Sequence, residues 1–471
     1  MQNNENSKGA ASRSFEARAK KRPSAAKPVT GRRPAQNTEG LKTRDVAVSA
    51  LYTVLVEHRP FDEAFARAAA ARDLPGRDRA FARLIATTAL RHRGSLQAVL
   101  STYLAKPLPE RMGRLDEILL AAAAQLLLLD TPPHAAISLA VDQCRADTSA
   151  KRFANLANAV LRRMSESGHG RLASLDNVSL TFPDWLIARW TNTYGAALAR
   201  QIARASLVEP ALDLTVKSDP EQWAEKIGAV VLPTNSVRCA QAGRVEDLPG
   251  YLEGAWWVQD AAAALPVKLL GGVAGLSVLD LCAAPGGKTA QLAAAGADVT
   301  AVDKSAGRLA RLSENLSRLG LSATTAVSDA LTFAAETQFD AVLLDAPCTA
   351  TGTIRRHPDI LSLKRPEDVG ALAALQKKLL DHAATLLKPG GVLVYCTCSL
   401  EPEEGESQIA EFLARHPNFA RRPIMLDRET IPISWRTSDG DLRTLPTHFD
   451  DLPQGLQGLD GFFAASLVKS C

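Results

Sequence analysis

The fold is decided by one stretch of sequence, Leu279-Asp280-Leu281-Cys282-Ala283-Ala284-Pro285-Gly286-Gly287-Lys288-Thr289. In it an apolar run ends in a turn of small residues and glycines, and a helical pattern follows. Small residues allow the backbone to approach a ligand closely, and the N-terminus of the next helix offers free N–H groups to an anionic group. The stretch therefore predicts a cofactor-binding loop between a strand and a helix.

Outward from this loop, the sequence alternates between apolar strands and helical patterns. The expected strands are 276–281, 298–302, 323–327, 340–344 and 391–396. This alternation is typical of a doubly wound, mainly parallel sheet, in which ligands bind at the carboxyl ends of the strands. Residues 263–471 are therefore predicted to form a Rossmann-like α/β domain with its site at that edge of the sheet.

Two kinds of cofactor compete for the loop. A P-loop for a nucleoside triphosphate needs a glycine where Cys282 stands, and Pro285 removes a backbone N–H from the phosphate cradle. Asp303 ends the second strand at the place of a ribose-binding acid, and Asp329 ends the third strand beside the expected adenine. The turn contains no G-x-G-x-x-G, which disfavours NAD. An adenosyl cofactor without a pyrophosphate is the better fit.

Two cysteines follow later strands of the same domain, Cys348 in Asp345-Ala346-Pro347-Cys348 and Cys398 in Tyr395-Cys396-Thr397-Cys398-Ser399. The chain has seven cysteines and no C-x-x-C, which favours free thiols over a disulfide framework or a zinc ribbon. A lone cysteine at a strand end is usually a small buried hydrophobe. Beside a cofactor loop, the pair instead suggests covalent chemistry. Cys396 is interpreted as structural, and no metal is expected.

The rest of the chain predicts two further domains and a tail. Residues 42–166 read as several helices without a strand signal, and the apolar run 118–129 among them is too short to span a bilayer. Residues 167–262 fit a small α/β connector domain with a strand at 211–217 and a helix at 220–227. Trp256 and Trp257 close the connector and are expected to pack against the cofactor module.

Positive charge is concentrated at the N-terminus. Residues 1–40 hold nine Lys or Arg against three Glu, a charge of +6, which leaves −2 for the remainder of a chain of net charge +4. A basic tail rich in Pro, Ser and Ala cannot bury enough surface to fold, so residues 1–41 are expected to be disordered. The tail either binds phosphates without reading sequence or only improves solubility, and both interpretations stay open. The N-terminus shows no secretory signal, so the expected compartment is the cytosol.

Basic side chains elsewhere suggest contacts with nucleic acid. The helical domain carries a candidate basic face that consists of Arg91, Arg93, Lys151, Arg152, Arg162 and Arg163, although plain solvated charge explains these residues equally well. Arg355, Arg356 and His357 lie just after Cys348 and are expected to contact phosphates beside a target. The acidic residues Glu401, Glu403, Glu404 and Glu406 suit the start of a helix rather than a catalytic cluster.

Taken together, these motifs resemble the RNA cytosine-C5 methyltransferases. The resemblance is carried by Cys-Ala-Ala-Pro-Gly-Gly-Lys-Thr, by Asp-Ala-Pro-Cys with the following 349–359, and by Thr-Cys-Ser. The helical region is similar to the RNA-binding domain of NusB, and this combination marks the RsmB type, also called Sun or Fmu. The resemblance implies S-adenosylmethionine as cofactor and a cytosine of 16S ribosomal RNA as substrate, either in free RNA or in a partly assembled small subunit. A cytoplasmic monomer is expected.

The resemblance also implies roles for the site residues. Cys398 is the nucleophile that adds to C6 of cytosine, Cys348 assists release of the methylated base, and Asp345 contacts the base near N3. The residues implied to bind the cofactor are Cys282, Ala283, Ala284, Pro285, Gly286, Gly287, Lys288, Asp303, Asp329 and Asp345. Lys288 could contact either the cofactor carboxylate or the base, and Arg355 and Arg356 are assigned to RNA.

Other functions remain as alternatives. The same chemistry could act on tRNA or another RNA. A non-catalytic RNA-binding factor is disfavoured because both thiols and both cofactor-side aspartates are present. A P-loop NTPase is disfavoured because Cys282 replaces the first glycine of its loop.

Overall fold

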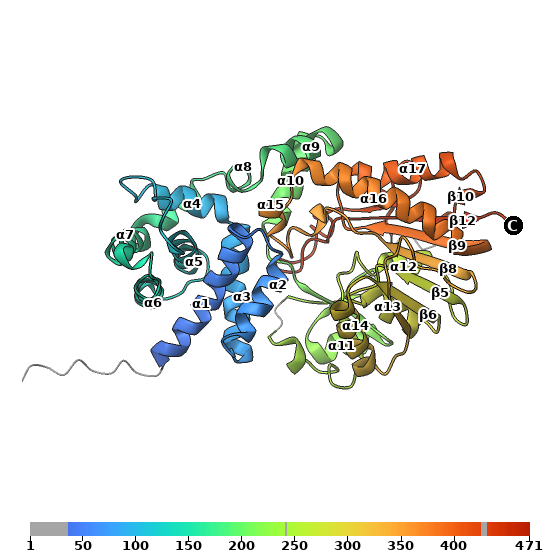
Figure 1. The fold of residues 1–471 in the computed structure, drawn as a ribbon, viewed down its shortest axis with the longest axis horizontal. Coiled ribbons are helices and arrows are strands. Elements are labelled where there is room, and N and C mark those ends of the chain that lie inside the picture. The colour runs from blue at the N-terminus through green and yellow to red at the C-terminus, as the bar shows by residue number, and fades with distance from the viewer. Residues whose placement is uncertain (1–35, 241–242, 425–430) are drawn as a thin grey trace, which may run out of the picture.

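The computed structural model describes residues 36–240, 243–424 and 431–471. A helical domain, a connector and an α/β domain follow one another along the chain (Figure 1). Most of the predicted tail 1–41 lies outside the described residues. Helix α1 (Gln36–Leu55) nevertheless begins inside it, and α7 (Ala154–Ala173) runs past the predicted border at 166. Both predicted borders of the helical domain therefore fall within helices.

The helical domain packs around α5 (Leu115–Leu127), which contains most of the apolar run noted in the sequence. Nearly every residue of α5 is buried, in line with the expectation of a core helix. Its neighbours are α1, α7 and the helices α3 (Gly76–Arg91), α4 (Arg93–Ser101) and α6 (Pro133–Ala146), while α2 (Phe61–Ala70) packs against α1. Across the described ranges, no helix combines the length and the apolar character needed to cross a bilayer.

One buried carboxyl in α5 makes the stability of this domain depend on pH. Glu117 is 4% exposed, and burial raises its pKa to about 7. The native state therefore holds a proton that the unfolded chain releases near its usual pKa, and the free energy of unfolding falls as pH rises from about 4.5 to about 7. We expect Glu117→Gln to remove up to ~3 kcal/mol of this loss, as measured by urea unfolding at pH 5 and pH 8. Glu110→Gln, at an exposed position, should leave the pH dependence unchanged.

The connector contains both elements predicted for it. Helices α8 (Asn177–Thr181), α9 (Asp184–Tyr194) and α10 (Ala196–Ser206) precede β1 (Leu212–Val216) and α11 (Pro220–Ile227). Strand β1 joins an antiparallel sheet of order β2-β3-β1-β4 with β2 (Val230–Val231), β3 (Val237–Cys239) and β4 (Trp256–Val258). As expected, Trp257 packs against the α/β domain, whereas Trp256 is part of the connector's own core.

The α/β domain is built on the predicted, mainly parallel sheet. Its parallel part has the order β9-β8-β5-β6-β7, from β5 (Ser277–Leu281), β6 (Asp298–Asp303), β7 (Thr324–Val327), β8 (Phe339–Asp345) and β9 (Leu387–Thr397). Antiparallel strands complete the sheet beyond β9, namely β12 (Phe462–Lys469), β10 (Phe419–Arg421) and β11 (Leu442–Thr444). Strand β9 begins four residues before its predicted start.

Helices cover both faces of this sheet (Figure 1). One face carries α16 (Pro366–Thr385) and α17 (Glu406–Arg415); the other carries α12 (Leu265–Leu269), α13 (Gly287–Ala294) and α14 (Ala306–Leu319). Because β5, β6, β7, β8 and β9 are parallel, their carboxyl ends meet at one edge of the sheet. Every catalytic and cofactor residue predicted from the sequence lies at that edge or in the loops that leave it.

Candidate active site

The predicted cofactor loop connects β5 to α13 in a tight, non-helical turn. Cys282 has a positive φ of 62°, and Gly286 has a φ of 102°. A Cβ on Gly286 would lie 2.5 Å from Leu312 of α14, so this position requires glycine. The N–H groups of Ala283, Ala284 and Gly286 are bonded within the protein, and Pro285 has none. The loop is therefore poorly suited to cradle a chain of phosphates.

Carboxylates surround the loop at the strand ends. Asp280 is fully buried and accepts a 2.6 Å hydrogen bond from Thr289, and burial raises its pKa to about 7. Asp303 accepts from the N–H of Ala284 at 3.2 Å, and Asp329 is exposed beyond β7. Acidic groups repel phosphates but suit a cofactor that offers hydroxyl and amino donors and a positive sulfonium. The residues present thus fit an adenosyl-sulfonium cofactor better than a nucleoside triphosphate.

Lys288 pairs with Asp345 across the site. Its Nζ lies 2.7 Å from Asp345 Oδ2, and the lysine is 8% exposed. Burial alone would lower the pKa of Lys288, but Asp345, Cys396 and Asp280 together outweigh burial, and the pKa is raised. Cys396 donates to the other oxygen of Asp345 at 3.6 Å, and the pKa of this thiol is raised by burial and by Asp345. Lys288 therefore remains a cation that orients Asp345.

Cys348 and Cys398 are brought together as direct neighbours. They follow the adjacent parallel strands β8 and β9, in which Asp345 lies opposite Cys396, and their sulfur atoms are 3.5 Å apart. The hydrogen bond to Cys398 and burial raise the pKa of Cys348 well above its usual value. Cys348 therefore keeps its proton and can donate an S–H to Cys398. An S–H donor stabilises a thiolate on the neighbouring sulfur.

Cys282 does not belong to this thiol pair. Burial, together with the nearby Asp345 and Asp303, raises the pKa of Cys282 to about 12. A thiol with such a pKa is not a nucleophile near neutral pH. Its position in the cofactor loop fits the predicted contact with the cofactor and gives it no part in covalent catalysis.

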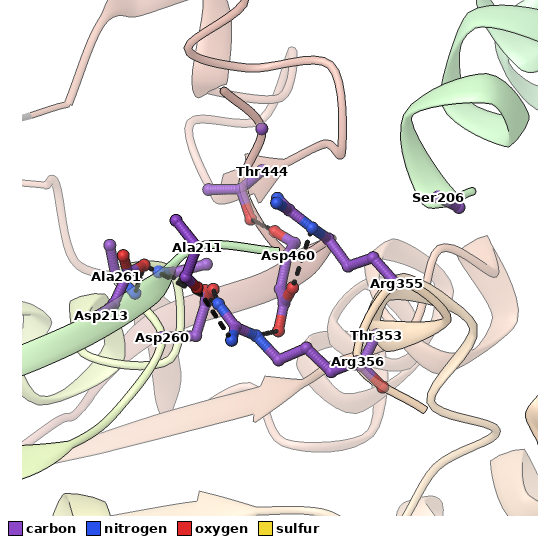
Figure 2. Close-up of polar contacts among 12 residues, drawn as sticks. Ser206, Ala211, Asp213, Asp260, Ala261, Thr353, Arg355, Arg356, Thr444 and Asp460 are labelled. Atoms are coloured by element: carbon purple, nitrogen blue, oxygen red, sulfur yellow. Dashed lines mark hydrogen bonds and ion pairs between the residues drawn. The ribbon is translucent and has the colours of Figure 1, made fainter. Parts of the chain in front are cut away.

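Arg355 and Arg356, which were predicted to contact phosphates, are bound in this structure to carboxylates of the protein itself. Arg355 is 1% exposed, and Arg356 lies between Asp260 and Asp460, at 2.5 Å and 2.9 Å from their carboxylates (Figure 2). Asp213 is also near, at 3.9 Å from Arg356 and at 2.6 Å from Arg238. The arginines therefore neutralise buried carboxylates and join the connector to the segment after Cys348.

The helical domain also contacts this segment. Arg91, predicted for the basic face, is buried and donates to the carbonyl of Arg355 at 3.0 Å. The N–H of Phe61, at the start of α2, donates to Asp359 at 3.0 Å. Of the predicted basic face, Lys151, Arg152, Arg162 and Arg163 remain exposed. The face is thus divided between an interface with the α/β domain and the surface of η1 (Lys151–Phe153) and α7.

Replacement of Arg356 tests the structural interpretation. Arg356→Met would leave Asp260 and Asp460 buried without the cation nearest to them, and removal of one partner from a buried ion pair costs about 3–5 kcal/mol. We expect urea unfolding to show this loss, while the salt dependence of RNA binding by the folded protein stays unchanged. Arg365→Met, at an exposed position, should alter stability by less than about 0.5 kcal/mol. If Arg356→Met keeps the wild-type stability and weakens the salt dependence of RNA binding, the predicted phosphate contact is supported instead.

Sequence reasoning missed two buried acids that follow Cys398. Glu401 is 1% exposed and accepts from Arg189 and Trp190 of α9 at 2.6 Å and 3.0 Å. Glu404 is fully buried and contacts the residues that follow both thiols. In the predicted acidic helix start, Glu406 alone begins α17. The spacing of the acids gave no signal of burial, because their partners come from distant segments.

Comparison with known proteins relates both ends of the chain to families. Residues 268–468 match the family described as 16S rRNA methyltransferase RsmB/F, and residues 41–166 match the NusB family. A protein of Cronobacter sakazakii named ribosomal RNA small subunit methyltransferase B is 35% identical over 83% of this chain and 91% of its own length. Its namesake in Salmonella arizonae is 36% identical over the same shares.

Solved structures share the fold. PH0851 is similar with a TM-score of 0.71 and 24% identity over 91% of this chain and 99% of that chain. NSun6 from Pyrococcus horikoshii with SFG is similar with a TM-score of 0.53 and 21% identity, over 62% of this chain and 99% of that chain. At these identities the likeness establishes the fold, in agreement with the predicted architecture.

Proposed function

The chain belongs to the RsmB/F family of 16S rRNA methyltransferases, and we propose that it methylates C5 of a cytosine through a covalent bond between Cys398 and C6. Methylation of ribosomal RNA with S-adenosylmethionine is the activity of this family. The observation that carries the finer proposal is the 3.5 Å separation of Cys348 and Cys398 beside the Lys288–Asp345 pair. The methyltransferase fold alone does not require two adjacent thiols.

Cys398 is the residue that activates the base. C5 of cytosine is a weak nucleophile, so the Cys398 thiolate adds to C6, opens the C5–C6 double bond and places the electron pair on C5. Asp345, held by Lys288, contacts the base near N3 and passes a proton from solvent to that nitrogen, which neutralises the charge that the addition pushes onto the ring. S-adenosylmethionine, when bound, would supply the electrophilic methyl group for C5 and would leave as its neutral thioether.

Cys348 serves the release step. After the methyl group is on C5, N3 returns its proton to solvent and water accepts the C5 proton. The electron pair of the C5–H bond then re-forms the C5–C6 double bond, and the bond from C6 to Cys398 breaks. Cys398 leaves as a thiolate, and the S–H of Cys348, 3.5 Å away, stabilises this leaving group. The same hydrogen bond keeps Cys398 ready for the next addition.

The cofactor is assigned to the edge described above. Asp303 would accept from ribose hydroxyls, Asp329 would lie beside the adenine, and the loop 282–287 would lie under the rest of the molecule. Lys288 is better assigned to Asp345 than to the cofactor carboxylate, because its ammonium already pairs with that aspartate. The NusB-like domain and its exposed basic residues on α7 are proposed to hold the RNA.

The test is to incubate the protein with labelled S-adenosylmethionine and unmodified RNA, then to identify the methylated nucleoside. We expect 5-methylcytidine in 16S ribosomal RNA, supplied either free or in partly assembled small subunits. Label in tRNA alone would show that tRNA is the substrate, and the proposed chemistry would still hold. A different methylated nucleoside would overturn the cytosine-C5 assignment. If ATP with magnesium raises the melting temperature and S-adenosylmethionine does not, the assignment of the cofactor is wrong.

A further inference from the structure

Glu404 connects the two thiol loops through hydrogen bonds to the residues that follow the thiols. It ends the short turn η4 (Pro402–Glu404) between β9 and α17, and its side chain is fully buried. Its carboxylate accepts from Thr349, which follows Cys348, and from Ser399, which follows Cys398. One side chain therefore fixes the position of both loops.

The two oxygens of this carboxylate share the Thr349 N–H, which lies 3.2 Å from Oε2 as well as close to Oε1, and otherwise bind different donors. Oε1 accepts from the Thr349 N–H at 2.9 Å and from Gln376 Nε2 at 3.0 Å. Oε2 accepts from the Ser399 hydroxyl at 2.5 Å and from the Thr349 hydroxyl. Gln376, on α16, also donates to the carbonyl of Pro347 at 2.9 Å. The residues on both sides of Cys348 are thus bonded to a single network.

The turn that carries Glu404 is itself fixed to β9. The carbonyl oxygen of Glu404 accepts from the Tyr395 hydroxyl at 2.8 Å and from the Thr397 hydroxyl at 3.2 Å. Both donors lie on the strand that leads to Cys398. A displacement of Glu404 would therefore move Cys398 relative to Cys348.

A carboxylate is a costly choice for such a buried position. Burial raises the pKa of Glu404, and the hydrogen bonds from Ser399 and Thr349 work in the opposite direction. All the partners named above are neutral donors, so the group is held for its capacity to accept several hydrogen bonds rather than for an ion pair. Packing alone would be served better by an apolar side chain.

We propose that Glu404 is a positioning residue, which holds Cys348 and Cys398 in register through Thr349 and Ser399 so that both thiols act on one base. The proposal rests on the two-thiol mechanism proposed above. It assigns Glu404 no contact with the cofactor or the base. Its loss should therefore slow formation of the Cys398 adduct without weakening the binding of either substrate.

The variant Glu404→Gln tests this role with little change in shape. The amide oxygen can occupy the place of Oε1, which faces two N–H donors, and the amide nitrogen then faces the Thr349 and Ser399 hydroxyls, which lose their acceptor. We expect adduct formation to slow about 10- to 100-fold, as a misplaced reacting group would. The measurement is the time course of the protein–RNA adduct on denaturing gels in the Cys348→Ala background, with the dissociation constants of S-adenosylmethionine and RNA measured in parallel.

Two further variants control the result. Glu403→Gln removes a charge from the same turn, where Glu403 is half exposed and pairs with Arg189, and should leave the rate unchanged. Ser399→Ala removes one donor to Glu404 and should slow the reaction by less; combined with Glu404→Gln it should add nothing. Should Glu404→Gln fail to fold, Ser399→Ala carries the test, and an unchanged rate for it overturns the proposal.

The outcomes separate this role from stability and from the mechanism itself. A wild-type rate per folded molecule of Glu404→Gln would show that Glu404 only stabilises the fold, and the proposal would be wrong. Methylation by Cys398→Ala would instead contradict the two-thiol mechanism, whatever rate the Glu404→Gln variant shows. A loss of cofactor affinity in Glu404→Gln would contradict a role confined to the thiol loops.

Discussion

Replacement of Cys398 with alanine is expected to abolish methylation of RNA, with a loss of about 10⁴-fold or more in the rate. The reason is that no other described thiol can take its place: Cys348 is held in the protonated form, and Cys396 is buried and donates to Asp345. The measurement is single-turnover transfer of label to 16S ribosomal RNA. Cys471→Ala, which removes an exposed thiol, should keep the wild-type rate.

Cys348→Ala provides the matched comparison for the neighbouring thiol. If Cys348 stabilises the departing Cys398 thiolate, this variant should form the adduct, transfer the methyl group and remain attached to the RNA on denaturing gels. If Cys348→Ala releases free methylated RNA over multiple turnovers, Cys348 is not needed for the release step. Label transfer by Cys398→Ala would show that the nucleophile has been assigned to the wrong residue.

The parts of the fold and site that could be predicted from the sequence are those encoded by short segments. Each of the strands β5, β6, β8 and β9 is a local apolar run, and the motif residues stand directly after them. Since parallel strands end at one edge, strand order alone brings Asp345, Cys348 and Cys398 together. No tertiary contact had to be known for this part of the prediction.

The contacts that the sequence could not predict are those between residues that are distant in the chain. Arg355 and Arg356 follow Cys348 and are basic, which in sequence is the pattern of a phosphate contact. In the structure Arg356 donates to Asp260 from the connector and to Asp460 from the C-terminal segment, about a hundred residues away on either side. Glu404 presents the same problem, because its proposed role depends on partners from other segments. Thr349 lies in the loop after β8, and Gln376 lies on α16.

Asp345→Asn is expected to slow methylation by about 10²-fold or more, because N3 of the base would lose the carboxyl group that passes it a proton. The amide would also leave Lys288, which is 8% exposed, without the counter-ion closest to it, and the lowering of the lysine's pKa by burial would then meet less opposition. We expect the defect to lie in adduct formation. The double variant Asp345→Asn, Cys348→Ala should therefore accumulate adduct more slowly than Cys348→Ala alone, on the same denaturing gels.

Asp340→Asn is the control for this substitution, because Asp340 lies on the same strand β8 at its opposite end and pairs with Lys388 at 2.6 Å. The same chemical change there should leave the rate of adduct formation at the wild-type value. If Asp345→Asn forms adduct as fast as the parent but methylates slowly, Asp345 acts on the cofactor rather than on the base. If both steps are unaffected, the Lys288–Asp345 pair is structural, and activation of the base must come from another group at the same edge of the sheet.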